Sequence, residues 1–257
     1  MWDIDLTLLH TRGITRAAYG AAFLSLTGFE PEVFPNFAGR TDLDAATEVF
    51  ARHGITEPDL DGFFALYAAE LLDRAHLIPG QGVLLAGARE VLTALAGRSE
   101  LVQTTVTGNI PPVARAKLVA FGLDRMLDLT VGGFGDQDTV RASLVTTSRR
   151  RAEEKYGTFA EVLVIGDTVH DVAAALACDV TAVGVASGKT GADELWAAGA
   201  HAVLDSLADV DAAVALLARG VDGNRRGAVR SGDGTCQDSS CPPHPSRPAM
   251  APSPPPT

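Results

Sequence analysis

The sequence predicts an α/β fold in which a doubly wound parallel sheet carries an inserted α-helical segment. From residue 84 onward, short apolar runs alternate with longer amphipathic segments, an order typical of a parallel sheet covered by helices on both faces. Residues 14–78 instead show helical periodicity and no strand pattern, which predicts a helical insertion after the first strand. A chain of 257 residues with 46% hydrophobic content can bury one core and one smaller domain.

The individual elements follow from the same periodicities. Strands are expected over residues 101–105, 127–131, 162–165, 182–185 and 202–204. Helices are expected over residues 84–96, 111–121, 138–156, 169–177, 191–198 and 206–218. Within the insertion, apolar residues such as Phe63, Tyr67 and Leu71 recur at helical spacing.

The elements divide the chain into three parts. Residues 1–13 and 80–220 form the predicted core, and residues 14–79 form the helical insertion. From Val221 the composition changes to Gly, Arg, Ser and Pro with almost no large apolar residue, so burial cannot offset the entropy of ordering. We therefore expect residues 221–257 to be a disordered tail. Cys236, Cys241 and His244 lie in it without a fourth zinc ligand at the usual spacing.

The charge and hydropathy of the chain exclude several classes of partner. A formal net charge of -11 argues against nucleic acid, because proteins that bind it usually present a basic face. The sequence contains no run of about 18 uncharged apolar residues and no basic-then-apolar signal segment, so no membrane association is expected. We expect a cytoplasmic protein with a small-molecule partner, and the sequence does not indicate its oligomeric state.

Three polar motifs fall where strands of the predicted sheet end. In open α/β sheets ligands bind outside the carboxyl ends of the strands, so these positions are candidate site residues. The first motif holds Asp3, Asp5 and Thr7, whose alternate spacing places both carboxylates on one side of an extended chain. Taken alone, two acids near a terminus are more often solvated than functional.

The second motif is Thr107-Gly108-Asn109, which follows the run 101–105. Asn109 suits a helix N-cap and Pro111 suits the first turn of that helix. Free backbone N–H groups there, together with the Thr107 hydroxyl, would form an anion site. An ordinary strand-to-helix turn is the alternative interpretation.

The third motif is Gly166-Asp167-Thr168-x-x-Asp171. Asp167 ends a strand that is expected to be buried on both faces, so its carboxylate needs a cation or strong hydrogen-bond donors. A hard, oxygen-binding metal ion is the simplest compensation. Asp171 is expected in the first turn of the following helix, where an acid also complements the helix dipole.

Together the three motifs resemble the haloacid dehalogenase superfamily, in its phosphoglycolate-phosphatase-like branch with a helical cap after the first motif. The resemblance covers residues 1 to about 215. The family also has a basic residue upstream of the last acidic motif. Arg141 lies 26 residues before Asp167, where the family usually has a lysine, and Lys117 is the alternative. The difference matters because a lysine is a point charge whereas an arginine is a planar fork.

The resemblance implies a Mg²⁺-dependent phosphatase that hydrolyses a small phosphorylated metabolite through an aspartyl-phosphate on Asp3. Asp5 would protonate the leaving alcohol and then activate water. Mg²⁺ would be held by Asp3, the main-chain carbonyl of Asp5 and Asp167, with Asp171 orienting the metal water or the basic residue. An acid two residues after the nucleophile also favours phosphoester chemistry over dehalogenation.

The resemblance assigns the remaining site residues to the substrate. Thr107, Gly108 and Asn109 would bind phosphoryl oxygens. In the cap, the segment 39–42 resembles the loop that meets the substrate, and Arg40 would read a substrate carboxylate or phosphate. An ordinary surface arginine is the alternative for Arg40.

Some features depart from the family pattern. Leu6 replaces the glycine that commonly stands between Asp5 and Thr7, so the backbone there must avoid positive φ or bear strain. Only two residues precede Asp3, whereas strands commonly run about five residues. We therefore expect a few apolar residues to precede Met1 in the functional protein. Two alternatives to a phosphatase stay open: a non-catalytic or regulatory binding protein and a β-phosphoglucomutase-like phosphomutase. The sequence does not name the phosphoester.

Overall fold

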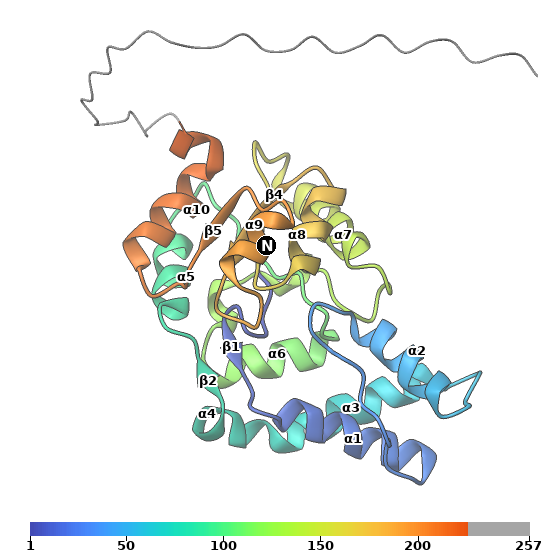
Figure 1. Ribbon diagram of the computed structural model, residues 1–257. Coiled ribbons are helices and arrows are strands. Elements are labelled where there is room, and N and C mark those ends of the chain that lie inside the picture. Colours follow the sequence, from blue (N-terminus) through green and yellow to red (C-terminus); the bar gives the residue numbers. More distant parts are fainter. Residues whose placement is uncertain (226–257) are drawn as a thin grey trace, which may run out of the picture.

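The computed structural model describes residues 1–225 and has an α/β architecture (Figure 1). The strands are β1 (Leu9–His10), β2 (Val83–Leu84), β3 (Leu163–Gly166), β4 (Thr181–Val185) and β5 (Ala202–Leu204). The α-helices are α1 (Ile14–Thr27), α2 (Asp42–Arg52), α3 (Leu60–Arg74), α4 (Ile78–Gln81), α5 (Ala88–Ala96), α6 (Pro111–Ala120), α7 (Arg141–Tyr156), α8 (Val169–Ala177), α9 (Ala192–Ala197) and α10 (Val210–Arg225). Short 3₁₀ helices are η1 (Ala75–Leu77), η2 (Asp124–Met126) and η3 (Leu129–Val131).

The sheet is parallel and has the first segment of the chain in its interior. β3, β4 and β5 pair in parallel, with Val183 opposite both Ile165 and Ala202. Trp2 bridges in parallel to Ile165 on one side and to Thr105 on the other. The later segments thus lie on both sides of the first one, which is the doubly wound order predicted from the sequence.

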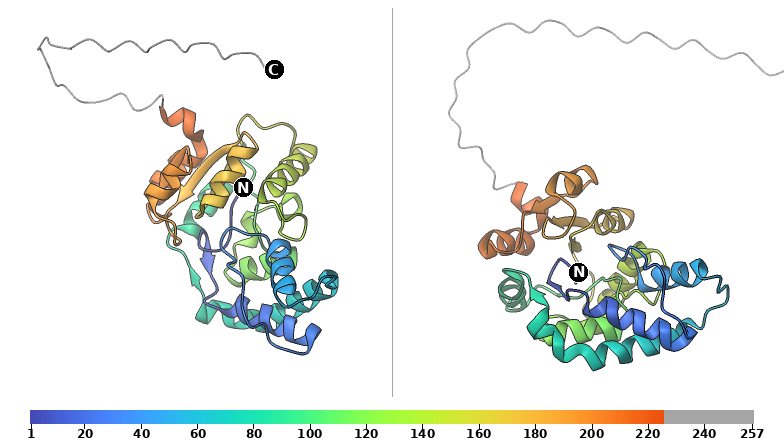
Figure 2. Two further views of the ribbon diagram at one scale, coloured as in Figure 1. Left: turned by 45° about the vertical axis from the view of Figure 1, so that its right-hand side comes forward. Right: turned by 60° about the horizontal axis from the view of Figure 1, so that its bottom comes forward.

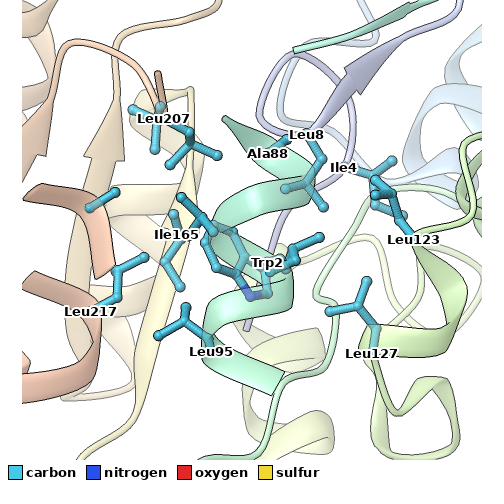
Figure 3. Close-up of a cluster of buried hydrophobic side chains, with 14 of the residues drawn as sticks. Trp2, Ile4, Leu8, Ala88, Leu95, Leu123, Leu127, Ile165, Leu207 and Leu217 are labelled. Atoms are coloured by element: carbon cyan, nitrogen blue, oxygen red, sulfur yellow. The ribbon is translucent and has the colours of Figure 1, made fainter. Parts of the chain in front are cut away.

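Helices cover both faces of this sheet. On one face, Trp2 packs with Leu95 of α5 and Leu217 of α10 (Figure 3). On the other face, Val164 of β3 packs with Leu144 of α7. Because each face is sealed by apolar side chains, polar groups of the sheet are accessible only at the strand ends.

Trp2 shows how this core accommodates a polar atom. Its side chain is 2% exposed, and its Nε1–H donates to Oε1 of Gln103 at 3.2 Å. The Gln103 amide in turn donates to the carbonyl of Leu92 at 2.9 Å. The indole nitrogen therefore has its partner inside the core, so the ring contributes its full apolar area to folding.

The inserted helices α1, α2 and α3 gather at one end of the molecule, away from β4 and β5 (Figure 2). They pack through buried aromatic rings, among them Tyr19, Phe50 and Phe63. The Tyr19 and Phe63 rings meet edge to face with centroids 4.9 Å apart, a favourable arrangement for two aromatic quadrupoles. The helical insertion is thus confirmed, and its boundaries at residues 14 and 79 stay a prediction.

Two of the predicted strands differ in the structure. The run 127–131 is not a strand, because Asp128 accepts bonds from the N–H and the hydroxyl of Thr130 and holds the chain in η3. The run 101–105 is extended but makes only an isolated bridge, at Thr105. The runs at β3, β4 and β5 are confirmed.

The first helix of the core also begins later than expected. Val83 and Leu84 pair antiparallel with β1, and Gly87, at φ 80°, precedes α5. The hydrogen bonds to β1 therefore outweigh the helical pattern at residues 84–87. This two-residue ladder could not be predicted, because its strands are too short to show a periodic pattern.

The end of the described chain also extends a prediction. α10 continues to Arg225, five residues into the segment 221–257 that was expected to be a tail. Propagating a helix that is already anchored costs little, because each further residue adds one hydrogen bond. The rest of the expected tail, with Cys236, Cys241 and His244, lies outside the described residues. Within residues 1–225, no helix is both long and apolar enough to cross a membrane, and the cytoplasmic location stays a prediction.

Candidate active site

The first polar motif folds into a tight turn at the carboxyl end of the sheet. Leu6 adopts φ 62°, in the left-handed region, so it bears the strain that its sequence position led us to expect. Such a conformation costs a non-glycine residue about 1–2 kcal/mol. The Leu6 N–H donates to the Leu9 carbonyl at 2.8 Å, and the Leu6 carbonyl accepts the Ser187 hydroxyl at 2.6 Å. These bonds hold the turn and keep Asp3 and Asp5 at the sheet edge.

Arg141, the first residue of α7, lies between two buried carboxylates. Its Nη2 donates to Oδ1 of Asp3 at 2.7 Å and lies 2.6 Å from Oδ1 of Asp171. All three side chains are buried. The Nε atom of Arg141 has no hydrogen-bond partner among residues 1–225. The structure therefore brings the two ends of the predicted motif set together around one guanidinium group.

Asp171 also has a local task in its helix. Its Oδ2 accepts the N–H and the hydroxyl of Thr168, at 3.1 and 2.6 Å, and Thr168 in turn caps the N–H of Asp171. This reciprocal capping box fixes the start of α8. Asp171 thus combines the helix-end role with the contact to Arg141.

Asp167 completes a cluster of three buried acids. One carboxylate oxygen each from Asp3, Asp167 and Asp171 lies within 4.8 Å of the others. The Thr7 hydroxyl donates to Oδ1 of Asp167 at 3.3 Å and links the first motif to the third. Thr7 is fully buried.

The electrostatics of this cluster suit a cation. Burial raises the pKa of Asp3 to about 7, against the opposing charge of Arg141. Burial, followed by the charges of Asp3 and Asp171, raises the pKa of Asp167 to about 8. The cluster holds three buried carboxylates, and Arg141 contacts two of them, Asp3 and Asp171, so the site lacks positive charge when the acids ionise. A hard divalent cation, which prefers oxygen ligands, would supply that charge.

Asp5 has a different environment, built on Lys117. The Lys117 ammonium of α6 donates to both carboxylate oxygens of Asp5, at 2.9 and 2.7 Å, and to Oδ1 of Asn109 at 2.6 Å. The Asn109 amide donates to Oδ2 of Asp5 at 2.7 Å. Burial opposes ionisation of Asp5, but the Lys117 charge and these bonds lower its pKa below the ordinary value.

The two candidate cations therefore serve different carboxylates. Arg141 contacts Asp3, and Lys117, which is 2% exposed, contacts Asp5. Both residues were predicted near the site from the sequence, but not which carboxylate each of them contacts. A lysine with both oxygens of one carboxylate is a structural feature that spacing in the sequence does not reveal.

The second motif differs in one respect from its prediction. Asn109 does not cap α6, because its amide donates to Asp5 and to the Thr107 hydroxyl, and Ile110 is the residue at the cap position. Among the backbone amides of residues 107–110, only that of Gly108 has no acceptor within the described part of the chain. The turn can therefore offer a phosphate oxygen one free amide.

A loop of the inserted helices docks on this turn. We call residues 39–42 the cap loop. The Asp42 N–H donates to the Gly108 carbonyl at 2.7 Å, and the Ile110 N–H donates to Oδ2 of Asp42 at 2.9 Å. A Cβ atom at Gly108 would lie 1.8 Å from the Arg40 carbonyl oxygen, so only glycine allows this approach.

Asp42, at the end of the cap loop, is buried where the loop meets the core. Burial raises its pKa to about 7, against the Ile110 N–H and the charge of Lys117, while the charges of Asp5 and Asp136 act with burial. Its carboxyl group therefore takes up a proton more readily than a solvated one.

Arg40 lines the site but is already paired. Its guanidinium group donates to the Asp44 carboxylate at 2.5 Å and forms an ion pair with Glu48, both on α2. The predicted reader of a substrate anion thus has two carboxylate partners in this structure.

These groups surround one cavity of about 580 Å³. All of the predicted site residues except Asp171 line it: Asp3, Asp5, Arg40, Thr107, Gly108, Asn109, Lys117, Arg141 and Asp167. Sequence reasoning missed Tyr19, Tyr67 and Lys189, which also line it. Lys189 follows the carboxyl end of β4, a signal that was available. The tyrosines gave none, because aromatic residues at helical spacing predict a core.

Comparisons with known proteins bear on the fold of the chain. Residues 142–210 match a family model described as HAD-hydrolase-like. A comparison with curated proteins finds no match. Among solved structures, a hydrolase from Pseudomonas syringae is 24% identical with a TM-score of 0.59, and the alignment covers 82% of this chain and 94% of that one.

Two further solved structures are similar to the chain. CbbY from Rhodobacter sphaeroides, in complex with phosphate, is 20% identical with a TM-score of 0.63, covering 84% of this chain and 97% of that one. A predicted phosphatase from Clostridium acetobutylicum is 19% identical with a TM-score of 0.58, covering 83% and 96%. At these identities the likeness is one of fold. The chain has the fold of the haloacid dehalogenase-like hydrolases with a helical cap. The resemblance drawn from its three motifs is thus confirmed for the fold of that superfamily, and the phosphoglycolate-phosphatase-like branch stays a prediction.

Proposed function

We propose that the protein is a Mg²⁺-dependent phosphatase that hydrolyses a small phosphomonoester through an aspartyl-phosphate on Asp3. The observation that carries the proposal is the cluster formed by Asp3, Asp167 and Asp171 beside a cavity of about 580 Å³, with Arg141 in contact with Asp3 and Asp171. That cavity also contains the turn at Thr107 and the carboxylate of Asp5. The match to CbbY, whose structure holds phosphate, supports a phosphorylated small molecule as the substrate.

Asp3 is the proposed nucleophile. Arg141 holds Oδ1, so Oδ2 is the oxygen that attacks phosphorus. The positive charge of Arg141 favours ionisation of Asp3 and reduces the repulsion between its carboxylate and the incoming phosphate. The free amide of Gly108 and the Thr107 hydroxyl are the proposed contacts to the phosphoryl oxygens.

Asp5 is the proposed general acid and base. Lys117 and Asn109 fix the orientation of its carboxylate, and its side chain is 39% exposed. A fixed carboxylate that still reaches the cavity can take a proton from water. To protonate the leaving alcohol, Asp5 must first bind a proton against the charge of Lys117, which lowers its pKa. Two carboxylates thereby divide two tasks that one group could not perform at the same time.

The acidic cluster is the proposed metal site. Asp3, Asp167 and the main-chain carbonyl of Asp5 would hold Mg²⁺, with Asp171 beside them. When bound, Mg²⁺ screens the carboxylates from the phosphate and stabilises charge on the transferring group. By its contact with Arg141, Asp171 would keep the guanidinium group of that arginine next to Asp3.

The test is phosphate release from para-nitrophenyl phosphate with and without Mg²⁺, in the parent protein and in Asp3→Asn. We expect Mg²⁺-dependent release by the parent and none above background by Asp3→Asn, because the amide is not a nucleophile. Asp211→Asn, an exposed acid on α10, is the matched control and should behave as the parent. Release by Asp3→Asn at the parent rate would reject Asp3 as the nucleophile.

A panel of sugar phosphates separates the competing functions. Isomerised phosphosugars without free phosphate would indicate a phosphomutase. Neither release nor isomerisation by the parent, with Mg²⁺ present, would indicate a binding protein.

A further inference from the structure

We propose that Tyr19 determines substrate specificity by donating its hydroxyl to an oxygen on the leaving group, so that the substrate is the phosphomonoester of an uncharged, hydroxyl-bearing alcohol. The inference rests on the proposed phosphatase function and names the substrate class of the same cavity. Tyr19 lies on α1, in the helical insertion that follows the first motif, and it lines the cavity that also holds Asp3 and Asp5.

The hydroxyl of Tyr19 has no partner within the protein. The residue is 1% exposed, and its hydroxyl makes no hydrogen bond with any of residues 1–225. Most buried polar groups are hydrogen-bonded, and an unmet one costs free energy in the absence of a ligand. Tyr19 borders a ligand cavity, so its unpaired hydroxyl is explained if a bound ligand supplies the acceptor.

The tyrosine ring is held rigidly, which gives the hydroxyl a defined direction. Phe37, Phe63 and Tyr67 each meet the ring edge to face, with centroids 5.1, 4.9 and 5.3 Å away. Packing from several sides restricts rotation of the side chain. A preorganised donor discriminates strongly, because a substrate without the acceptor leaves the group unpaired in a dry site.

The hydroxyl remains a donor over the working pH range. Burial, and after it the charge of Asp42, raises the pKa of Tyr19 above its ordinary value. A neutral phenol can donate to an uncharged substrate oxygen, such as that of an alcohol, at little desolvation cost. A charged substrate group buried beside the phenol would instead need a counter-charge.

The charges around the cavity also favour an uncharged leaving group. Arg40, the cation on the cap loop, is engaged by Asp44 and Glu48. Arg16 lines the cavity one turn before Tyr19, but it is exposed and stacks over the Phe34 ring at 4.0 Å. Lys189, which also lines the cavity, is exposed as well. An exposed cation is screened by water and contributes little to specificity. The buried donor, rather than any of these cations, therefore sets the requirement on the substrate.

The kinetic test compares two six-carbon phosphoesters, sorbitol 6-phosphate and hexyl phosphate. They have the same carbon chain, and the polyol carries a hydroxyl on every carbon except the one that bears the phosphate, so an acceptor is available along the leaving group. In the parent, kcat/KM for the polyol ester should exceed that for the alkyl ester. In Tyr19→Phe, the ratio of the two should fall about 10-fold, the equivalent of one neutral hydrogen bond. Tyr156→Phe, an exposed tyrosine on α7, is the control and should keep the parent ratio.

A binding measurement gives an answer that does not depend on turnover. In the Asp3→Asn background, sorbitol 6-phosphate with Mg²⁺ should raise Tm, and the added Tyr19→Phe change should remove most of that rise. Without ligand, Tyr19→Phe should melt no lower than the parent, because it removes an unmet polar group. A lower Tm would show that the hydroxyl has a structural partner and would overturn the inference.

The two proposals fail in different ways. If the parent does not hydrolyse para-nitrophenyl phosphate, the phosphatase function is contradicted. Hydrolysis by the parent with an unchanged polyol-to-alkyl ratio in Tyr19→Phe would overturn only the role of Tyr19. Absence of any thermal shift with sorbitol 6-phosphate would also overturn it.

Discussion

The close approach of the cap loop to Gly108 makes this glycine a sensitive place to perturb the closed cavity. In Gly108→Ala, the new Cβ would lie 1.8 Å from the Arg40 carbonyl oxygen, whereas real Cβ contacts are essentially never below 3.0 Å. The cap loop must therefore retreat by at least 1.2 Å. The core side cannot yield as easily, because the flanking Thr107 N–H is bonded to Gly133.

A displacement of that size breaks the two hydrogen bonds that Asp42 makes with the turn, now 2.7 and 2.9 Å long. At about 1 kcal/mol net for each bond, the docked state loses about 2 kcal/mol. That energy corresponds to about a 30-fold change in the equilibrium between docked and undocked cap loop. The sheet, which makes none of these contacts, should keep its stability.

Hydrogen exchange measures this equilibrium directly. The amides of Asp42 and Ile110 should exchange up to about 30-fold faster in Gly108→Ala, whereas amides of β4 should not change. We expect kcat/KM for para-nitrophenyl phosphate to fall by up to the same factor. Gly80→Ala, where a Cβ meets nothing within 4 Å, is the matched control. Unchanged exchange and turnover in Gly108→Ala would refute the docked arrangement.

Three further changes test other parts of the structure. The pKa of Asp42 is raised from 3.8 to about 7, so between these pH values the folded state holds a proton that the unfolded state has released. The contribution of Asp42 to the free energy of unfolding should therefore decline between pH 4 and 7, by up to about 1.4 kcal/mol per pH unit. The difference in free energy of unfolding between the parent and Asp42→Asn, measured in urea, should follow that decline. Trp2→Ala should lower the free energy of unfolding by about 3–5 kcal/mol, as a lower urea midpoint, and a loss below about 1 kcal/mol would contradict its place in the core. Mg²⁺ should raise Tm of the parent but not of Asp167→Asn, and equal shifts in both would remove Asp167 from the metal site.

Local chemistry explains why so much of the fold could be predicted. The strands β3 and β4 are buried on both faces over most of their length, so their sequences are continuous apolar runs. α8 begins and ends where its sequence pattern predicts, because the Thr168 and Asp171 capping box is itself a local feature. Elements fixed by a few neighbouring residues, such as these, are visible in the sequence.

The elements that differ depend on contacts between distant segments. Residues 84–87 leave the expected helix because Leu84 pairs with Leu9. Asn109 leaves its expected cap position because Asp5, 104 residues away, accepts its amide. Neither partner can be identified from spacing, since loop closure brings them together only in the folded chain.

The sequence by itself determined which groups are available for chemistry, because a motif at the end of a buried strand needs no distant information to place its carboxylates at the sheet edge. It thus predicted the acids Asp3, Asp5 and Asp167 and the two candidate cations. Only the tertiary structure decided how they pair: Arg141 with Asp3, and Lys117 with Asp5. Pairing is decided there because the free energy of a charge contact depends on distance and burial, and both are set by how α6 and α7 pack against the sheet.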